Sequence, residues 1–112
     1  KICKTEEFQN ENVKFALQSG PMLLIDKEVN DMFNPISENR FIRNAVGIVN
    51  DYEAVFVFAI KDINLYELSM IMKEHGCTYA LYLDGGISSV YYPAKKIFDS
   101  EANYGVIIGV IK

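Results

Sequence analysis

The chain has 112 residues, which is enough for one domain and too few for two. Half of the residues are hydrophobic, so we expect a packed core and exclude a disordered chain. The net charge is −4 and the 11 basic residues are scattered, which argues against nucleic acid as a partner. The longest apolar runs, 55–60 and 106–111, are far shorter than a membrane span, so no transmembrane segment is predicted in this chain.

The N-terminal part of the chain is predicted to contain two short strands followed by a long loop. Val13–Leu17 alternates apolar and polar residues with period two, and Met22–Ile25 is a second apolar run that ends at the turn Asp26-Lys27. Asn30–Arg43 has no clean period and contains Asn, Pro and Ser, so we predict a loop, with one helical turn near Met32-Phe33. A loop of this length in a small domain is often functional.

The middle of the chain is predicted to form a hairpin. Ala45–Val49 and Ala54–Ile60 are both apolar, and Asn50-Asp51 supplies turn residues between them.

One clear helix is predicted over Asn64–His75. Four apolar residues recur at helical spacing and form one stripe, Leu65, Leu68, Ile71 and Met72. Asn64 followed by Glu67 fits a capping box at the start of the helix, and Gly76 can adopt the left-handed conformation that ends it.

The C-terminal part is predicted to contain two strands around an irregular stretch. Thr78–Leu83 and Gly105–Ile111 are strongly apolar, whereas Tyr91–Tyr104 shows no period. The strand–helix–strand order allows a right-handed crossover, while the hairpins imply antiparallel pairs. We therefore predict an α/β (α+β) fold with a mixed β-sheet and one helix at about 64–75.

The two cysteines, Cys3 and Cys77, are too few to define a disulfide framework. We interpret them as two separate buried thiols, and a Cys3–Cys77 bridge is the alternative. The single histidine, His75, lies at the predicted helix end, where a structural or solvated role is expected rather than catalysis. Because no His or Cys residues have metal-ligand spacing, we predict no metal site, and we expect no cofactor.

The main chemical candidate is Asp84, a carboxylate directly after an apolar strand. It is followed by Gly85-Gly86 and by the hydroxyls of Ser88 and Ser89. Glycines let the main chain approach a ligand closely, so Asp84 could act as acid, base or nucleophile with the serines as hydrogen-bond partners. The alternative is an ordinary turn, since Asp-Gly is also a strong hairpin signal.

Two further polar segments could contribute to a site. Arg43 lies where the long loop meets a strand, and its planar guanidinium suits a phosphate or carboxylate. Gln18-Ser19-Gly20-Pro21 lies between two predicted strands and could face a pocket at the end of the sheet. The alternatives are a surface arginine and a plain strand break.

Three ordered segments of the sequence, 16–23, 43–47 and 80–89, together resemble the phosphodiester glycosidase family, to which the lysosomal uncovering enzyme belongs. The resemblance implies a hydrolase that cleaves a sugar from a sugar-1-phosphodiester of the N-acetylglucosamine type. It implies that Asp84 is the key carboxylate and that Arg43 holds the phosphate. The remaining substrate contacts that it implies are Gln18, Ser19, Gly20, Gly85, Gly86 and Ser88.

The resemblance also carries expectations about context. Family domains are longer than this chain, so residues 1–112 are expected to be the C-terminal portion of a single domain, in a secreted or periplasmic protein. The expected partner is a sugar phosphodiester or phosphorylated glycan, and exposed strand edges could pair with the N-terminal half or another copy. The alternative function is a non-catalytic binding module for phosphorylated surface glycans. A third is a purely structural domain in which Asp84 is a turn residue.

Overall fold

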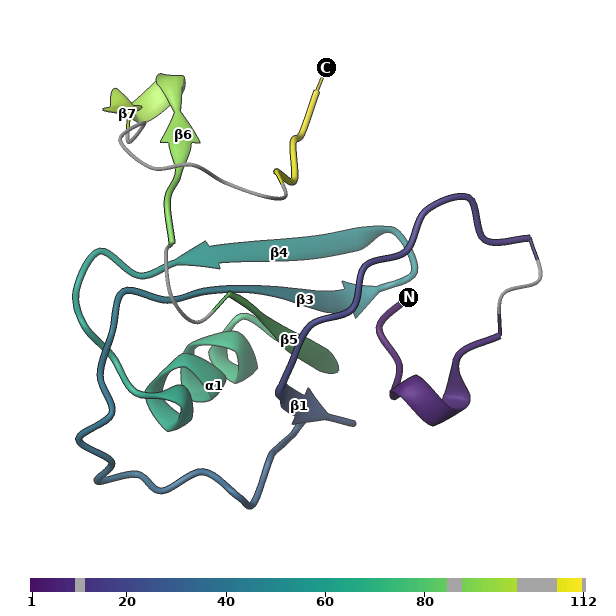
Figure 1. The fold of residues 1–112 in the computed structure, drawn as a ribbon, viewed down its shortest axis with the longest axis horizontal. Coiled ribbons are helices and arrows are strands. Elements are labelled where there is room, and N and C mark those ends of the chain that lie inside the picture. Colours follow the sequence, from purple (N-terminus) through teal and green to yellow (C-terminus); the bar gives the residue numbers. More distant parts are fainter. Residues whose placement is uncertain (10–11, 85–87, 99–106, 112) are drawn as a thin grey trace.

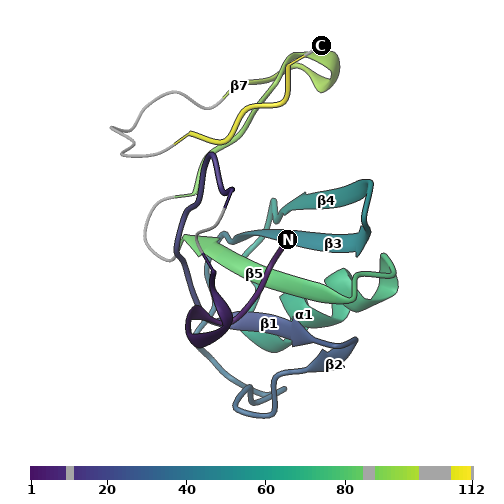
Figure 2. The same cartoon turned by 90° about the vertical axis from the view of Figure 1, so that its right-hand side faces the viewer.

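The computed structural model describes residues 1–9, 12–84, 88–98 and 107–111. Its elements in chain order are η1 Thr5–Glu7, β1 Met22–Ile25, β2 Glu28–Val29, β3 Asn44–Asn50, β4 Glu53–Phe58, α1 Leu65–Glu74, β5 Tyr79–Asp84, β6 Tyr91–Tyr92, η2 Pro93–Lys95 and β7 Ile97–Phe98. Five strands form one sheet in the order β2-β1-β5-β3-β4, and α1 packs over one face of it (Figure 1). The β6–β7 pair stands away from this sheet (Figure 2).

The predicted α+β class is confirmed, but the strand directions differ from the prediction of a mixed sheet. Every strand pair in the described part of the chain is antiparallel. β4 and β5 do run parallel to each other, as the predicted strand–helix–strand unit requires. They are not neighbours, because β3 lies between them and pairs with both. The sheet is consequently antiparallel around a central β5.

Helix α1 begins and ends as its sequence predicts. Asn64 accepts a hydrogen bond from the Glu67 N–H at 2.9 Å, and the Glu67 carboxylate accepts from the Asn64 N–H at 3.1 Å, which completes the capping box. His75 is the C-cap, and Gly76 follows with φ of +78°, a conformation that glycine adopts without strain. Local sequence therefore sets both ends of the helix.

The core lies between α1 and the sheet. Its buried side chains come from α1, from strands β1, β3 and β5, and from the connection between α1 and β5, namely Leu23, Leu24, Ala45, Leu68, Met72, Cys77, Ala80 and Tyr82. Gly47 lets the helix side approach β3, because a Cβ built there would stand 2.6 Å from the Met72 methyl and 2.5 Å from the Cys77 sulfur. A glycine at this position thus permits the close packing of sheet and helix.

Two predicted strands are wrong. Residues 13–17 contain a bend at Lys14 and pair with no described strand, and Phe15 is 94% exposed. Residues 107–111 also form no strand and are exposed, while 105 and 106 lie outside the described residues. Both segments have strand-like patterns, but a strand also needs a partner to satisfy its backbone hydrogen bonds.

Smaller differences concern turns and short strands. Asp26 and Lys27 both have positive φ, and they join β1 to the unpredicted strand β2 as a tight hairpin. A helical turn is expected near Met32-Phe33, but the structure has a non-helical turn there, closed by a hydrogen bond from the Phe33 N–H to the Asn30 carbonyl. The stretch 91–104, expected to be irregular, contains the β6–β7 pair.

Cys3 and Cys77 are both free thiols, as predicted, and Cys77 is buried, but the prediction that Cys3 is also buried is wrong because Cys3 is partly exposed. Burial raises the pKa of the Cys77 thiol, and the Glu53 carboxylate adds a smaller effect in the same direction. Across the described ranges, no helix has both the length and the apolar character that crossing a membrane would require.

Candidate functional site

The sheet is irregular where β5 ends. Asn44 pairs with Asp84 across β3 and β5, but the next residue, Ala45, pairs with Tyr82. One residue of β5, Leu83, is therefore extra in this register and forms a bulge. Bulges are common next to active sites, because they change the direction of the strand and of its side chains.

Three segments that are distant in sequence meet at this end of β5. The Ser19 hydroxyl lies 2.7 Å from the carbonyl oxygens of both Tyr82 and Leu83. The Asn44 side-chain amide donates to the Ser88 hydroxyl at 2.9 Å. Ser19, Asn44 and Ser88 are all partly buried. The end of β5 is thus enclosed by polar groups from residues before β1, at the start of β3 and after β5.

The predicted site residues differ in where they lie relative to the end of β5. The backbone of Asp84 is described as the last residue of β5, but its side chain, like Gly85, Gly86 and Ile87, lies outside the described residues. Gln18 is exposed and donates to the Thr5 hydroxyl, while Gly20 is exposed with open space around it. The structure therefore brings Ser19 and Ser88 to the end of β5 and leaves Gln18 and Gly20 at the surface.

Arg43 lies on the helix side of the sheet and is 4% exposed. Its Nε donates to the Ile63 carbonyl at 2.9 Å, and its Nη1 donates to the Tyr82 hydroxyl at 2.8 Å. Its Nη2 donates to the main-chain and side-chain oxygens of Asn39 at 3.0 and 2.9 Å. The Phe41 and Tyr82 rings also lie 5.3 and 5.1 Å from the guanidinium carbon. Arg43 is therefore buried, and the alternative interpretation of a surface arginine is wrong.

The loop between β2 and β3 is tied to the start of α1. The buried Asn64 amide donates to the carbonyls of Pro35 and Ser37 at 3.1 and 3.2 Å. Arg40 forms a two-pronged ion pair with Glu67, with distances of 3.0 and 2.9 Å. The hydrogen bond from Arg40, with a smaller effect of the bond from the Asn64 N–H, lowers the pKa of the Glu67 carboxyl. These contacts hold the loop against the first turn of α1.

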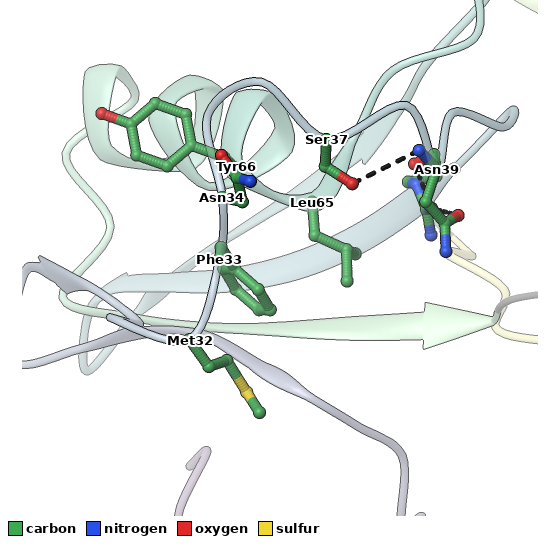
Figure 3. A pocket seen from close by; sticks show the side chains of 8 residues that line it. Met32, Phe33, Asn34, Ser37, Asn39, Leu65 and Tyr66 are labelled. Carbon is green, nitrogen blue, oxygen red and sulfur yellow. Dashed lines mark hydrogen bonds between the residues drawn. The ribbon is translucent and has the colours of Figure 1, made fainter.

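A cavity of about 200 Å³ lies between this loop and the first turn of α1. Figure 3 shows the side chains that line it, which are the apolar Met32, Phe33, Leu65 and Tyr66 and the polar Asn34, Ser37, Asn39 and Arg43. Half of the lining residues are polar, and the cavity is smaller than the range of about 300–1,000 Å³ that is usual for small-molecule sites. Within the described ranges, no group of three or more His, Cys, Asp or Glu side chains is arranged to hold a metal ion.

Sequence reasoning missed the residues that connect the site. Asn44 follows the arginine in the motif, and its only signal is a polar residue at the first position of an apolar strand. Tyr82 lies in the 80–89 segment that carries the resemblance, beside the Asp84 turn, but its contact to Arg43, like that of Asn39, depends on the fold.

Residues 1–111 match the profile of a family described as phosphodiester glycosidase. The chain belongs to the phosphodiester glycosidase family. This confirms the resemblance inferred from the three segments. The chain is also similar to an uncharacterised Escherichia coli K12 protein, YigE, with 36% identity over 92 residues. The match covers 80% of this chain and 36% of YigE, so the chain spans little more than a third of that relative. No solved structure matches the chain.

Proposed function

We propose that the end of β5 hydrolyses a sugar-1-phosphodiester, of the N-acetylglucosamine-1-phosphodiester type. The observation that carries the proposal is the meeting of Ser19, Asn44 and Ser88 at the strand end that leads into Asp84, in a member of the phosphodiester glycosidase family. Carboxylates in glycosidases act at the anomeric carbon, so a strand ending in Asp84 beside polar donors suits this reaction.

In the proposed reaction, the bond between the anomeric carbon and the phosphate oxygen breaks. Water supplies a hydroxyl to the sugar and a proton to the medium, and the phosphate leaves as a monoester anion. Because this anion is already a good leaving group, proton donation to it is less important than in ordinary glycoside hydrolysis. A single carboxylate, Asp84, can then serve as nucleophile or as base for the attacking water.

Asn44 and Ser88 are the proposed hydrogen-bond donors to the phosphate. The Ser88 hydroxyl accepts from Asn44, so its own hydrogen can point toward a ligand. The Asn44 amide has a second N–H group that can do the same. Hydrogen bonds from such donors to an anion are stronger than those between neutral groups.

Turnover of methyl N-acetylglucosamine-1-phosphate diester tests the proposal. The assay compares the 112-residue chain and the longest form that the gene encodes, each as the natural sequence, as Asp84→Asn and as Asp51→Asn. Asp51 is a matched control, because it is an exposed carboxylate in the turn at the far end of β3. We expect Asp84→Asn to abolish release of free sugar and Asp51→Asn to retain it. Equal activity of the two variants would remove Asp84 from the reaction.

A non-catalytic binding module for phosphorylated glycans is the second candidate. The cavity between the 30–43 loop and α1 favours it, since Asn34 and Asn39 could bond sugar hydroxyls beside the buried positive charge of Arg43. Calorimetry with N-acetylglucosamine 1-phosphate separates the two functions. Saturable binding with no product by chromatography would support the binding module, whereas product formation would support the hydrolase.

A further inference from the structure

Arg43 has little capacity left for a ligand. A guanidinium carries five N–H groups, and the bonds to Ile63, Tyr82 and Asn39 use four of them. Arginine usually holds phosphate with two parallel N–H groups on one edge of the fork. A single remaining N–H cannot provide such an edge, so a phosphate could be held in this way only if existing bonds broke.

The partners of Arg43 also explain how the charge is tolerated in the core. Within the described part of the chain, the guanidinium bonds only to neutral oxygens and contacts the Phe41 and Tyr82 rings. A buried charge is destabilising unless such groups replace its hydration. Withdrawing these bonds to bind a substrate would remove the groups that replace the hydration of the guanidinium, whereas the Ile63 carbonyl would keep its bond from the Phe41 N–H.

Arg43 connects the elements that surround the proposed site. It links the long loop through Asn39, the entry to α1 through Ile63 and strand β5 through Tyr82. Tyr82 is the last residue before the bulge at the end of β5. Its side chain is held by Arg43, and its main-chain carbonyl lies within hydrogen-bond distance of the Ser19 hydroxyl.

We propose that Arg43 is a positioning residue, which fixes Tyr82 and thereby the main chain leading into Asp84, and that it does not contact the substrate phosphate. The expected effect of Arg43 on the reaction rate rests on the proposed function. It assigns Arg43 a different role from the phosphate contact that the family resemblance implies.

The kinetic test uses the active form of the protein as Arg43→Lys, Tyr82→Phe and the double variant. A positioning role predicts that Tyr82→Phe, which removes only a hydroxyl, lowers kcat about 10-fold or more with KM almost unchanged. The kcat of the double variant should be no lower than that of the less active single variant, since both substitutions remove the same Arg43–Tyr82 hydrogen bond. Arg40→Lys is the control and should retain activity, because Arg40 is exposed and does not contact Tyr82.

A direct phosphate contact gives the opposite pattern. Tyr82→Phe would then stay near the natural activity, while Arg43→Lys would raise both KM and the inhibition constant of inorganic phosphate; this pattern would overturn the inference. A second readout does not depend on turnover. The Arg43 Nε–H should exchange slowly with water because it is bonded to the Ile63 carbonyl, and its exchange rate should not change when inorganic phosphate is added. Faster exchange with phosphate would show that this bond opens for the anion, which would overturn the positioning role even if the protein hydrolyses no diester. Absent turnover with an unchanged exchange rate would reject only the proposed function.

Discussion

Adding a single methyl group at Gly47 is expected to destabilise the fold strongly. A Cβ at this position would stand 2.5 Å from the Cys77 sulfur, 3.0 Å from the Cys77 Cβ and 2.6 Å from the Met72 methyl. The Met72 methyl can move away by rotation, because this side chain is flexible. The Cys77 side chain is short and buried at 1% exposure, so relief there requires the sheet and the helix end to separate.

Overpacking of this kind typically destabilises by 1–3 kcal/mol, so we expect Gly47→Ala to lose about 2 kcal/mol. For a domain of this size, that corresponds to a decrease in Tm of roughly 10 °C. Urea unfolding followed by circular dichroism measures the loss directly. Gly109→Ala is the control, because nothing lies within 4 Å of a Cβ at Gly109, and it should change stability by less than ~0.5 kcal/mol.

The double variant Gly47→Ala/Cys77→Ala identifies the contact responsible. Removing the sulfur eliminates the 2.5 Å contact, so the double variant should be at least ~0.5 kcal/mol more stable than the sum of the single effects. If Gly47→Ala unfolds at the same urea concentration as the natural chain, the close packing of β3 against the helix side is wrong.

Three further predictions concern the helix start and the thiols. Asn64→Ala removes the N-cap of α1 and two hydrogen bonds to the loop, so it should lower the free energy of unfolding in urea by ~2 kcal/mol or more. A loss below ~0.5 kcal/mol would contradict these hydrogen bonds. Because the pKa of the Glu67 carboxyl is lowered in the folded state, its ionised form stabilises the fold above the unfolded-state pKa, and this stabilisation is lost as the pH falls through the folded-state pKa. Arg40→Met should raise the Glu67 pKa measured by carbon-detected NMR, and an unchanged pKa would refute the ion pair. Cys3 should react with iodoacetamide well before Cys77, whose thiol is buried with a raised pKa, and equal rates by mass spectrometry would contradict that burial.

Features that depend on neighbouring residues were predictable from the sequence. The capping residues Asn64 and Glu67 lie within one helical turn, and they define the start of α1 without any tertiary information. The β3–β4 hairpin follows similarly from two apolar runs around a short turn. The segments containing Ser19, Asn44 and Ser88 were recognised as motifs, and the fold places parts of all of them at one end of β5.

Features that depend on distant pairing were not predictable. Residues 13–17 alternate like a strand, but alternation carries no information on whether another edge accepts the segment. The bulge at the end of β5 arises from the register with β3, which no local pattern encodes. The partners of Arg43 include Tyr82, which is 39 residues away, and Ile63, which is 20 away. For this reason a motif arginine could be recognised while its surroundings could not.

The most direct test of the account is the fate of solvent oxygen during hydrolysis of the N-acetylglucosamine-1-phosphodiester in water enriched in oxygen-18. Mass spectrometry of both products shows which bond breaks. We predict that the label enters the sugar and is absent from the phosphate monoester, and that Asp84→Asn forms neither product. Label in the phosphate would mean cleavage between phosphorus and oxygen, which would contradict a glycosidase at the end of β5.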